Sequence, residues 1–153
     1  FLKINDSNTQ ILWQTGESYF LKAKAKSKNY NNVKVLPFIK EMNFAYSVAD
    51  IIVSRAGAST ISELCLIGKP VILVPSPNVA EDHQTKNATF LVNKNAAMMI
   101  NDNEAKKVMP IILQKLLNDT LTQIKLAKNF KKLAIYDSAS NIADEIIKLA
   151  HKK

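Results

Sequence analysis

Several residue types are scarce in this chain, and each scarcity excludes a class of protein. The 153 residues contain one cysteine, Cys65, so neither a disulfide framework nor a paired-cysteine metal site is available. No apolar run approaches the roughly 20 residues that cross a bilayer, and the N-terminus lacks the pattern of a signal peptide. We therefore expect a cytosolic domain, held together by a core drawn from its 47% hydrophobic residues.

Glycine is also scarce, and known glycine-based motifs are missing. The three glycines form no GxGxxG or GxxxxGK[ST] phosphate loop. There is no GxSxG sequence of the kind that carries a hydrolase nucleophile, and no His/Asp/Glu spacing typical of a metal site. We therefore expect neither a metal nor a cofactor.

The charge is one-sided, because lysine greatly outnumbers every other ionisable residue. The formal net charge is +8, and Arg55 is the only arginine. Such a balance favours an anionic partner, whether a phosphate-bearing ligand, an acidic membrane surface or a nucleic acid. Scattered lysines are also typical of a solvated surface. Nucleic-acid binding is not expected, because arginine and exposed aromatics do not interleave with the basic residues.

Short apolar runs alternate with amphipathic stretches, which predicts alternating strands and helices. Strands are predicted at residues 10–16, 32–38, 49–57, 70–75 and 96–100. Helices are predicted from the first strand to about residue 30, at 41–49, 58–68 and 82–92, and over 103–153 with breaks near 118–119 and 137–138. This order predicts a single α/β domain over residues 1–153, built on one Rossmann-like parallel sheet with helices on both faces.

Ligands of parallel sheets bind outside the carboxyl ends of the strands, where loops lead into helices. Three loops occupy such positions in the predicted fold. They follow Phe38, span Arg55–Ser59 and span Ser76–Gln84.

The segment RAGASTISE places Gly57 in a predicted tight turn between a strand and a helix that begins near Ser59–Thr60. The start of a helix carries unpaired N–H groups and about half a positive charge, so it can hold a diphosphate. Glu63 could accept hydrogen bonds from ribose hydroxyls. A second interpretation stays open, in which Thr60 and Glu63 form a capping box that only completes the helix.

The other two loops offer groups for a sugar and a base. In EDHQTKNA, the side chains of His83, Gln84 and Asn87 could pair with sugar hydroxyls; alternatively, Asp82 caps the helix and the others face water. Phe38 and the Ile39 backbone could meet a flat base, unless Phe38 belongs to the core.

Taken in order, FIKEMNFAYSVADIIVSRAGASTISE, GKPVILVPSP and EDHQTKNA resemble the C-terminal domain of the MurG family of bacterial glycosyltransferases. The resemblance covers essentially the whole chain. It implies the C-terminal half of a GT-B glycosyltransferase that takes N-acetylglucosamine from UDP-N-acetylglucosamine to a lipid-linked muramyl-pentapeptide acceptor. The enzyme would work as a peripheral protein on the inner face of the cytoplasmic membrane.

The resemblance also implies a role for each matching residue. Ile39 would read the uracil through its backbone, Glu63 would hold the ribose, and Gln84 would bind the sugar beside His83 and Asn87. The residues implied for the diphosphate and its surroundings are Ala58, Ser59, Thr60, Ile61 and Ser62. Arg55 matches a family arginine, without an assigned role.

Two family features are absent from this sequence, namely the glycine-rich GGS motif and the N-terminal acceptor domain. The resemblance implies inversion at the anomeric carbon without an obligatory metal, with the general base in the absent domain. We therefore expect the chain alone to be inactive. Two alternatives stay open: a separate donor-binding subunit of the Alg13 type, and half of a related glycolipid synthase that uses another UDP-sugar.

Overall fold

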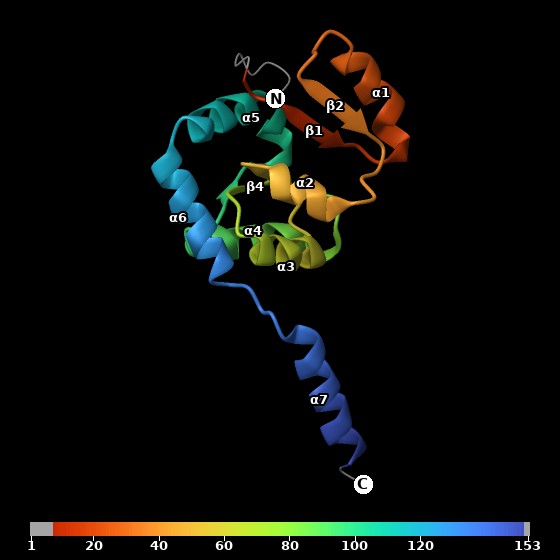
Figure 1. The fold of residues 1–153 in the computed structure, drawn as a ribbon, viewed down its shortest axis with the longest axis vertical. Coiled ribbons are helices and arrows are strands. Elements are labelled where there is room, and N and C mark those ends of the chain that lie inside the picture. The colour runs from red at the N-terminus through yellow and green to blue at the C-terminus, as the bar shows by residue number, and fades with distance from the viewer. Residues whose placement is uncertain (1–7, 152–153) are drawn as a thin grey trace.

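The computed structural model describes residues 8–151 as alternating parallel strands and helices (Figure 1). The strands are β1 (Ile11–Gln14), β2 (Val33–Leu36), β3 (Ile52–Ser54), β4 (Val71–Leu73) and β5 (Met98–Met99). The helices are α1 (Glu17–Ser27), α2 (Met42–Val48), α3 (Ala58–Ile67), α4 (His83–Asn93), α5 (Asp102–Leu117), α6 (Thr120–Lys131) and α7 (Ser138–Ala150), and a short 3-10 helix, η1 (Ala80–Asp82), precedes α4. The predicted order and the α/β class are confirmed, although each strand is shorter than predicted.

The strands form two parallel sheets, so the prediction of one continuous sheet is wrong for the described residues. β1 pairs with β2, and β4 pairs with β3 on one side and β5 on the other. No described strand joins β1 to β3. In keeping with this break, Leu12 and Val53 on those two strands remain 44% and 43% exposed.

Strand β4 is the centre of the core. Its side chains alternate between the two faces of the sheet, as the pleat requires. Val71 and Leu73 pack in one cluster with residues of α3, α4 and α6, and Ile72 packs in a second cluster with residues of α5 and α6. The strand predicted at residues 70–75 is therefore confirmed, and its residues 71–73 are buried on both faces of the sheet.

The C-terminal helical region is interrupted twice, near the two predicted positions: between α5 and α6, and before α7. α5 ends at Leu117, and Asp119 caps α6 by accepting a hydrogen bond from the Thr122 N–H at 2.9 Å. Helix α6 then packs Phe130, which is fully buried, into the core.

Helix α7 has no buried residue and projects from the rest of the molecule after an extended connector (Figure 1). Its apolar side chains Ile142, Ile146 and Leu149 are 61%, 61% and 67% exposed. They recur at spacings of four and three residues, so they form one apolar stripe along the helix.

Cys65 of α3 is 4% exposed, and burial raises the pKa of its thiol. It therefore serves as an apolar core residue. Among the described residues, no helix is long and apolar enough to span a membrane.

Gly68 ends α3 as predicted, in a left-handed conformation with φ 64°, and its N–H donates to the Leu64 carbonyl. A Cβ atom at this position would lie 3.0 Å from the Lys131 Cβ atom of α6. We expect Gly68→Ala to lower the free energy of unfolding by about 2 kcal/mol or more, through the strained φ and the crowding together. Urea denaturation measures this loss.

The control for this substitution is Gly57→Ala. Gly57 has φ −69°, and its nearest non-neighbouring atom would lie 3.9 Å from the added Cβ. That variant should stay within about 1 kcal/mol of the wild type. Equal losses for the two variants would contradict our interpretation of Gly68.

Candidate functional site

The start of α3 lies at the carboxyl end of β3, and its first backbone N–H groups are open, that is, without a hydrogen-bond acceptor among the described residues. The helix begins at Ala58, with Gly57 as the residue before it. The Ile61 N–H donates to the Gly57 carbonyl at 2.9 Å. The N–H groups of Ala58, Ser59 and Thr60 have no acceptor within the described part of the chain. Together with the helix dipole, these donors favour an anion.

The capping-box interpretation of Thr60 and Glu63 is wrong. Helix α3 starts two residues before Thr60, so Thr60 already lies inside the first turn and cannot be the capping residue. No side chain caps this helix. The Ser62 hydroxyl donates instead to the Ala58 carbonyl one turn back, at 3.1 Å.

Gly57 has an ordinary extended backbone, which corrects the prediction of a glycine-dependent turn. Its φ of −69° and ψ of 144° are open to any residue. A Cβ atom would meet only the Thr60 hydroxyl, at 3.9 Å. The fold itself therefore does not require glycine here, and the missing side chain leaves space beside the open N–H groups.

Glu63 lies on the exposed side of α3 and accepts a hydrogen bond from Tyr46 of α2. The Tyr46 hydroxyl is 3.3 Å from Oε2 of Glu63. Burial, together with the Glu63 carboxylate, raises the pKa of the Tyr46 phenol. The phenol therefore stays a donor at neutral pH.

Gln84 joins the loops that follow β3 and β4. Its Oε1 atom accepts from the Ser76 N–H at 2.9 Å and from the Ala56 N–H at 3.3 Å. Asn87, one turn further along α4, donates from Nδ2 to the Ala56 carbonyl at 3.1 Å. Both side chains therefore fasten α4 to Ala56, which is fully buried.

Asp82 and His83 precede and begin α4. The interpretation of Asp82 as a side-chain cap is wrong, because Asp82 occupies the capping position with φ 52° but accepts no capping hydrogen bond from its helix. The side chain of His83 is exposed. It lies next to Gln84 at the same edge of the sheet.

The loop after β2 exposes an aromatic ring beside a backbone that is already in use. Phe38 is 65% exposed, so its interpretation as a core residue is wrong. The Ile39 N–H donates to Oε1 of Gln14, at the end of β1, at 2.8 Å. The Ile39 carbonyl accepts no hydrogen bond from the described residues.

Arg55 links three elements at this edge of the sheet. One guanidinium nitrogen donates to the Val74 carbonyl at 3.1 Å and the Pro75 carbonyl at 3.3 Å. The same nitrogen forms an ion pair with Asp102, the first residue of α5. Arg55 thus connects the ends of β3 and β4 to the start of α5.

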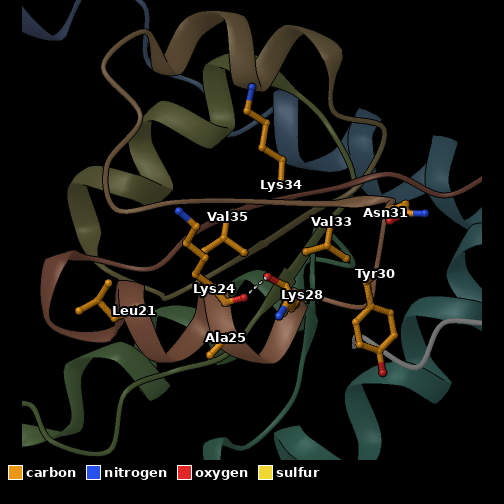
Figure 2. Close-up of a pocket in the computed structure, with 10 residues that line it drawn as sticks. Leu21, Lys24, Ala25, Lys28, Tyr30, Asn31, Val33, Lys34 and Val35 are labelled. Atoms are coloured by element: carbon orange, nitrogen blue, oxygen red, sulfur yellow. Dashed lines mark hydrogen bonds between the residues drawn. The ribbon is translucent and has the colours of Figure 1, made fainter.

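The predicted site residues do not line the hollow that the structure has beside α1. That hollow, of about 660 Å³, lies between α1 and β2 and is bordered by Lys24, Lys28, Tyr30 and Lys34 among others (Figure 2). Figure 2 shows Lys34 on the opposite side of β2 from Val33 and Val35. The hollow lies along the length of β2 instead of at the carboxyl ends of the strands, and it is separate from the candidate site.

The structure thus brings the β3–α3 and β4–α4 loops together through Ala56, and joins Glu63 to Tyr46. Sequence reasoning missed Tyr46, Gln14 and the bracing role of Arg55. Tyr46 and Gln14 carried no usable signal, because each meets its partner across more than 15 residues of chain. Within residues 8–151, no three His, Cys, Asp or Glu side chains gather as a metal site requires.

Comparison with known proteins gives one family and a set of long relatives. The family Glycosyltransferase family 28 C-terminal domain matches residues 1–146. The chain is 47% identical over 146 residues to the UDP-N-acetylglucosamine–N-acetylmuramyl-(pentapeptide) pyrophosphoryl-undecaprenol N-acetylglucosamine transferase of Flavobacterium psychrophilum, and 51% identical over 149 residues to that of Parabacteroides distasonis. These matches cover 95% and 96% of the chain, but only 40% of each relative.

Solved structures agree with the sequence relatives. The crystal structure of MurG from Acinetobacter baumannii matches with a TM-score of 0.76 and 31% identity, over 91% of this chain and 41% of that one. The glycosyltransferase VinC, solved in complex with DTDP, matches with a TM-score of 0.65 at 16% identity, over 99% of this chain and 44% of that one. The expected fold, that of the C-terminal half of a GT-B glycosyltransferase, is confirmed.

The hydrogen bonds of Gln84 predict a structural cost that does not depend on any ligand. Gln84→Ala leaves the N–H groups of Ala56 and Ser76 unpaired, so we expect a loss of about 1–3 kcal/mol in the free energy of unfolding. Gln84→Glu keeps an acceptor and should retain most of the stability. Lys86→Ala, on the exposed side of α4, should change it by less than about 0.5 kcal/mol. Urea denaturation in which Gln84→Ala matches Lys86→Ala would refute the bridging role.

Proposed function

Because this chain belongs to the glycosyltransferase family 28 C-terminal domain family, we propose that it is the donor-binding domain of a MurG-type transferase. Its donor would be UDP-N-acetylglucosamine, and the acceptor would be the lipid-linked muramyl-pentapeptide in the relatives' name. Residues 1–153 would form this one domain, and the enzyme would take part in peptidoglycan synthesis.

The open start of α3 is the observation that carries this proposal. The free N–H groups of Ala58, Ser59 and Thr60 supply a diphosphate with donors and positive potential. Gly57 leaves room for the phosphate oxygens to approach the backbone. Ile61 and Ser62 complete the same turn of the helix.

The nucleoside would lie between α3 and the loop after β2. The exposed Phe38 ring offers a stacking surface for a base, and the unpaired Ile39 carbonyl can accept from the N3–H group of uracil. The Ile39 N–H becomes available to the base only when Gln14 turns aside. Glu63 would accept hydrogen bonds from the ribose hydroxyls.

The sugar would lie against the start of α4. Since the Gln84 carbonyl already holds two backbone N–H groups, its amide nitrogen is the part left to donate to a sugar hydroxyl. His83 and Asn87 flank this position from the same helix. Gln84 would thus both hold the site together and contact the ligand.

The chemistry assigned to this chain is control of the leaving group. When the acceptor hydroxyl attacks and the anomeric bond breaks, negative charge grows on the departing diphosphate. The fixed N–H dipoles of the α3 start stabilise that charge in place, without having to reorganise. The general base would come from a second domain, with inversion at the anomeric carbon.

Helix α7 supports the need for a further protein part. Its apolar stripe of Ile142, Ile146 and Leu149 is exposed, whereas such stripes are normally buried against another element. The relatives are more than twice as long as the matched region, so they contain sequence that could cover this stripe. A separate subunit carrying the acceptor site would cover it equally well.

A lipid-linked acceptor would place the reaction at a membrane surface. The net charge of +8 suits peripheral attachment to anionic lipid on the cytoplasmic side. A related glycolipid synthase that uses another UDP-sugar would share this arrangement, since a few side chains near Gln84 choose the sugar. Comparing the affinities of the chain for UDP-N-acetylglucosamine, UDP-glucose and UDP-galactose separates these two activities.

Substitution of Gly57 tests the donor site without disturbing the fold. We expect Gly57→Ala to keep the free energy of unfolding within about 1 kcal/mol of the wild type. Its affinity for UDP-N-acetylglucosamine should fall about tenfold, because the added methyl group crowds the diphosphate. Titration calorimetry measures the affinity. The proposal fails if the wild type shows no binding at millimolar UDP-N-acetylglucosamine, or if Gly57→Ala binds it with the wild-type affinity.

The apolar stripe of α7 gives a second test. The double variant Ile142→Asp/Ile146→Asp should keep the wild-type melting temperature and donor affinity, because neither side chain is buried within this chain. When the chain is mixed with the N-terminal part of the Flavobacterium psychrophilum relative, the wild type should restore sugar transfer and this variant should not. Ser140→Asp/Asn141→Asp adds the same charge and should restore transfer. Equal activity of both variants would exclude the stripe as an interdomain contact.

A further inference from the structure

A hydrogen bond between two helices fixes the carboxylate of Glu63. The Tyr46 hydroxyl of α2 donates to Oε2 of Glu63 on α3 at 3.3 Å. The two residues are 17 positions apart, and the strand β3 lies between them in the chain. The bond is therefore made by the tertiary fold, and neither helix could form it alone.

The two partners differ in mobility. Tyr46 is partly buried and packs against the core cluster that contains Ala56, Leu64 and Cys65. Glu63 is exposed, and a free glutamate side chain samples many rotamers. A tyrosine held by packing has few conformations, so its hydroxyl is a fixed point. The bond therefore restricts the conformations of the exposed Glu63 carboxylate.

The bond also leaves one of the two Glu63 carboxylate oxygens without a partner among the described residues. Oε2 faces the Tyr46 hydroxyl, whereas Oε1 accepts no hydrogen bond from the described residues. Because the phenol is partly buried beside a negative charge, its pKa is raised and it remains a donor. A carboxylate has room for further donors on both oxygens. The free oxygen can accept from the vicinal hydroxyls of a ribose.

We propose that Tyr46 is a positioning residue that orients Glu63 to receive the nucleotide ribose; this inference rests on the proposed function. Tyr46 does not itself touch the ligand. It lowers the conformational cost that Glu63 would otherwise incur when the ribose binds. The preference of the site for ribonucleotides over 2′-deoxyribonucleotides then depends on Tyr46, even though Glu63 makes the contact.

Tyr46→Phe tests this role, because it keeps the ring in the core and removes only the hydroxyl. Titration calorimetry of the 153-residue chain with UDP and with 2′-deoxy-UDP gives the ratio of the two affinities. We expect Tyr46→Phe to weaken UDP binding about threefold to tenfold, the range of one ordinary hydrogen bond. Binding of 2′-deoxy-UDP should change by less than about twofold, because that ligand gains less from Glu63.

Three further variants make the result specific. Glu63→Ala should abolish the preference for UDP, and adding Tyr46→Phe to it should cause no further loss. Such non-additivity is expected of two residues that act as one unit. Tyr136→Phe removes the hydroxyl of an exposed tyrosine outside the site and should leave both affinities unchanged.

Each possible result decides a different point. If Tyr46→Phe weakens both ligands equally, or lowers the melting temperature together with both affinities, Tyr46 is only structural and the inference is wrong. If the wild type binds UDP with a ribose preference that Tyr46→Phe preserves, the inference alone fails. If the wild type binds no UDP, the proposed function fails first.

Discussion

Burial of β4 on both faces is the constraint on which the rest of the structure depends. Val71, Ile72 and Leu73 are fully buried, and they hold helices on opposite sides of the sheet. Because the strand cannot shift, its carboxyl end is a fixed point for the neighbouring loops. Gln84 and Arg55 both bind backbone groups just after this strand, so the site is anchored to the one described strand whose residues are all buried.

The site contains backbone N–H groups without a hydrogen-bond partner and others that are already hydrogen-bonded. The first N–H groups of α3 have no partner among the described residues, whereas the N–H groups of Ala56, Ser76 and Ile39 are held by glutamine side chains. Unpaired donors at a helix start cost little while they face water, and they are ready for an anion. The paired donors keep the loops in place while the site is empty. The hydrogen-bonded N–H groups therefore hold the loops in place, and the unpaired N–H groups are available to a ligand.

Two surfaces of the chain are less complete than its core. Strands β1 and β3 belong to separate sheets, and α7 exposes an apolar stripe. Both features leave apolar side chains partly in water, which a stable fold normally avoids. Leu12, Val53 and the α7 stripe take no part in the two core clusters around β4, so the loops after β4 can form before any further protein covers these surfaces. This separation fits a domain that binds one substrate and relies on another part for catalysis.

The sequence by itself determined the order of strands and helices, the buried strand at Val71–Leu73, the helix end at Gly68 and the placing of the loops after β3 and β4 at one edge, because these depend on local periodicity and on glycine. Its motifs also led to the family. Only the tertiary structure decided that Gly57 needs no special backbone, that Phe38 is exposed, and that the sheet is divided. The partners of Tyr46, Gln14 and Arg55 were likewise decided by the fold. Each of these contacts joins residues far apart in the chain, and their meeting depends on how whole elements pack, which no local pattern encodes.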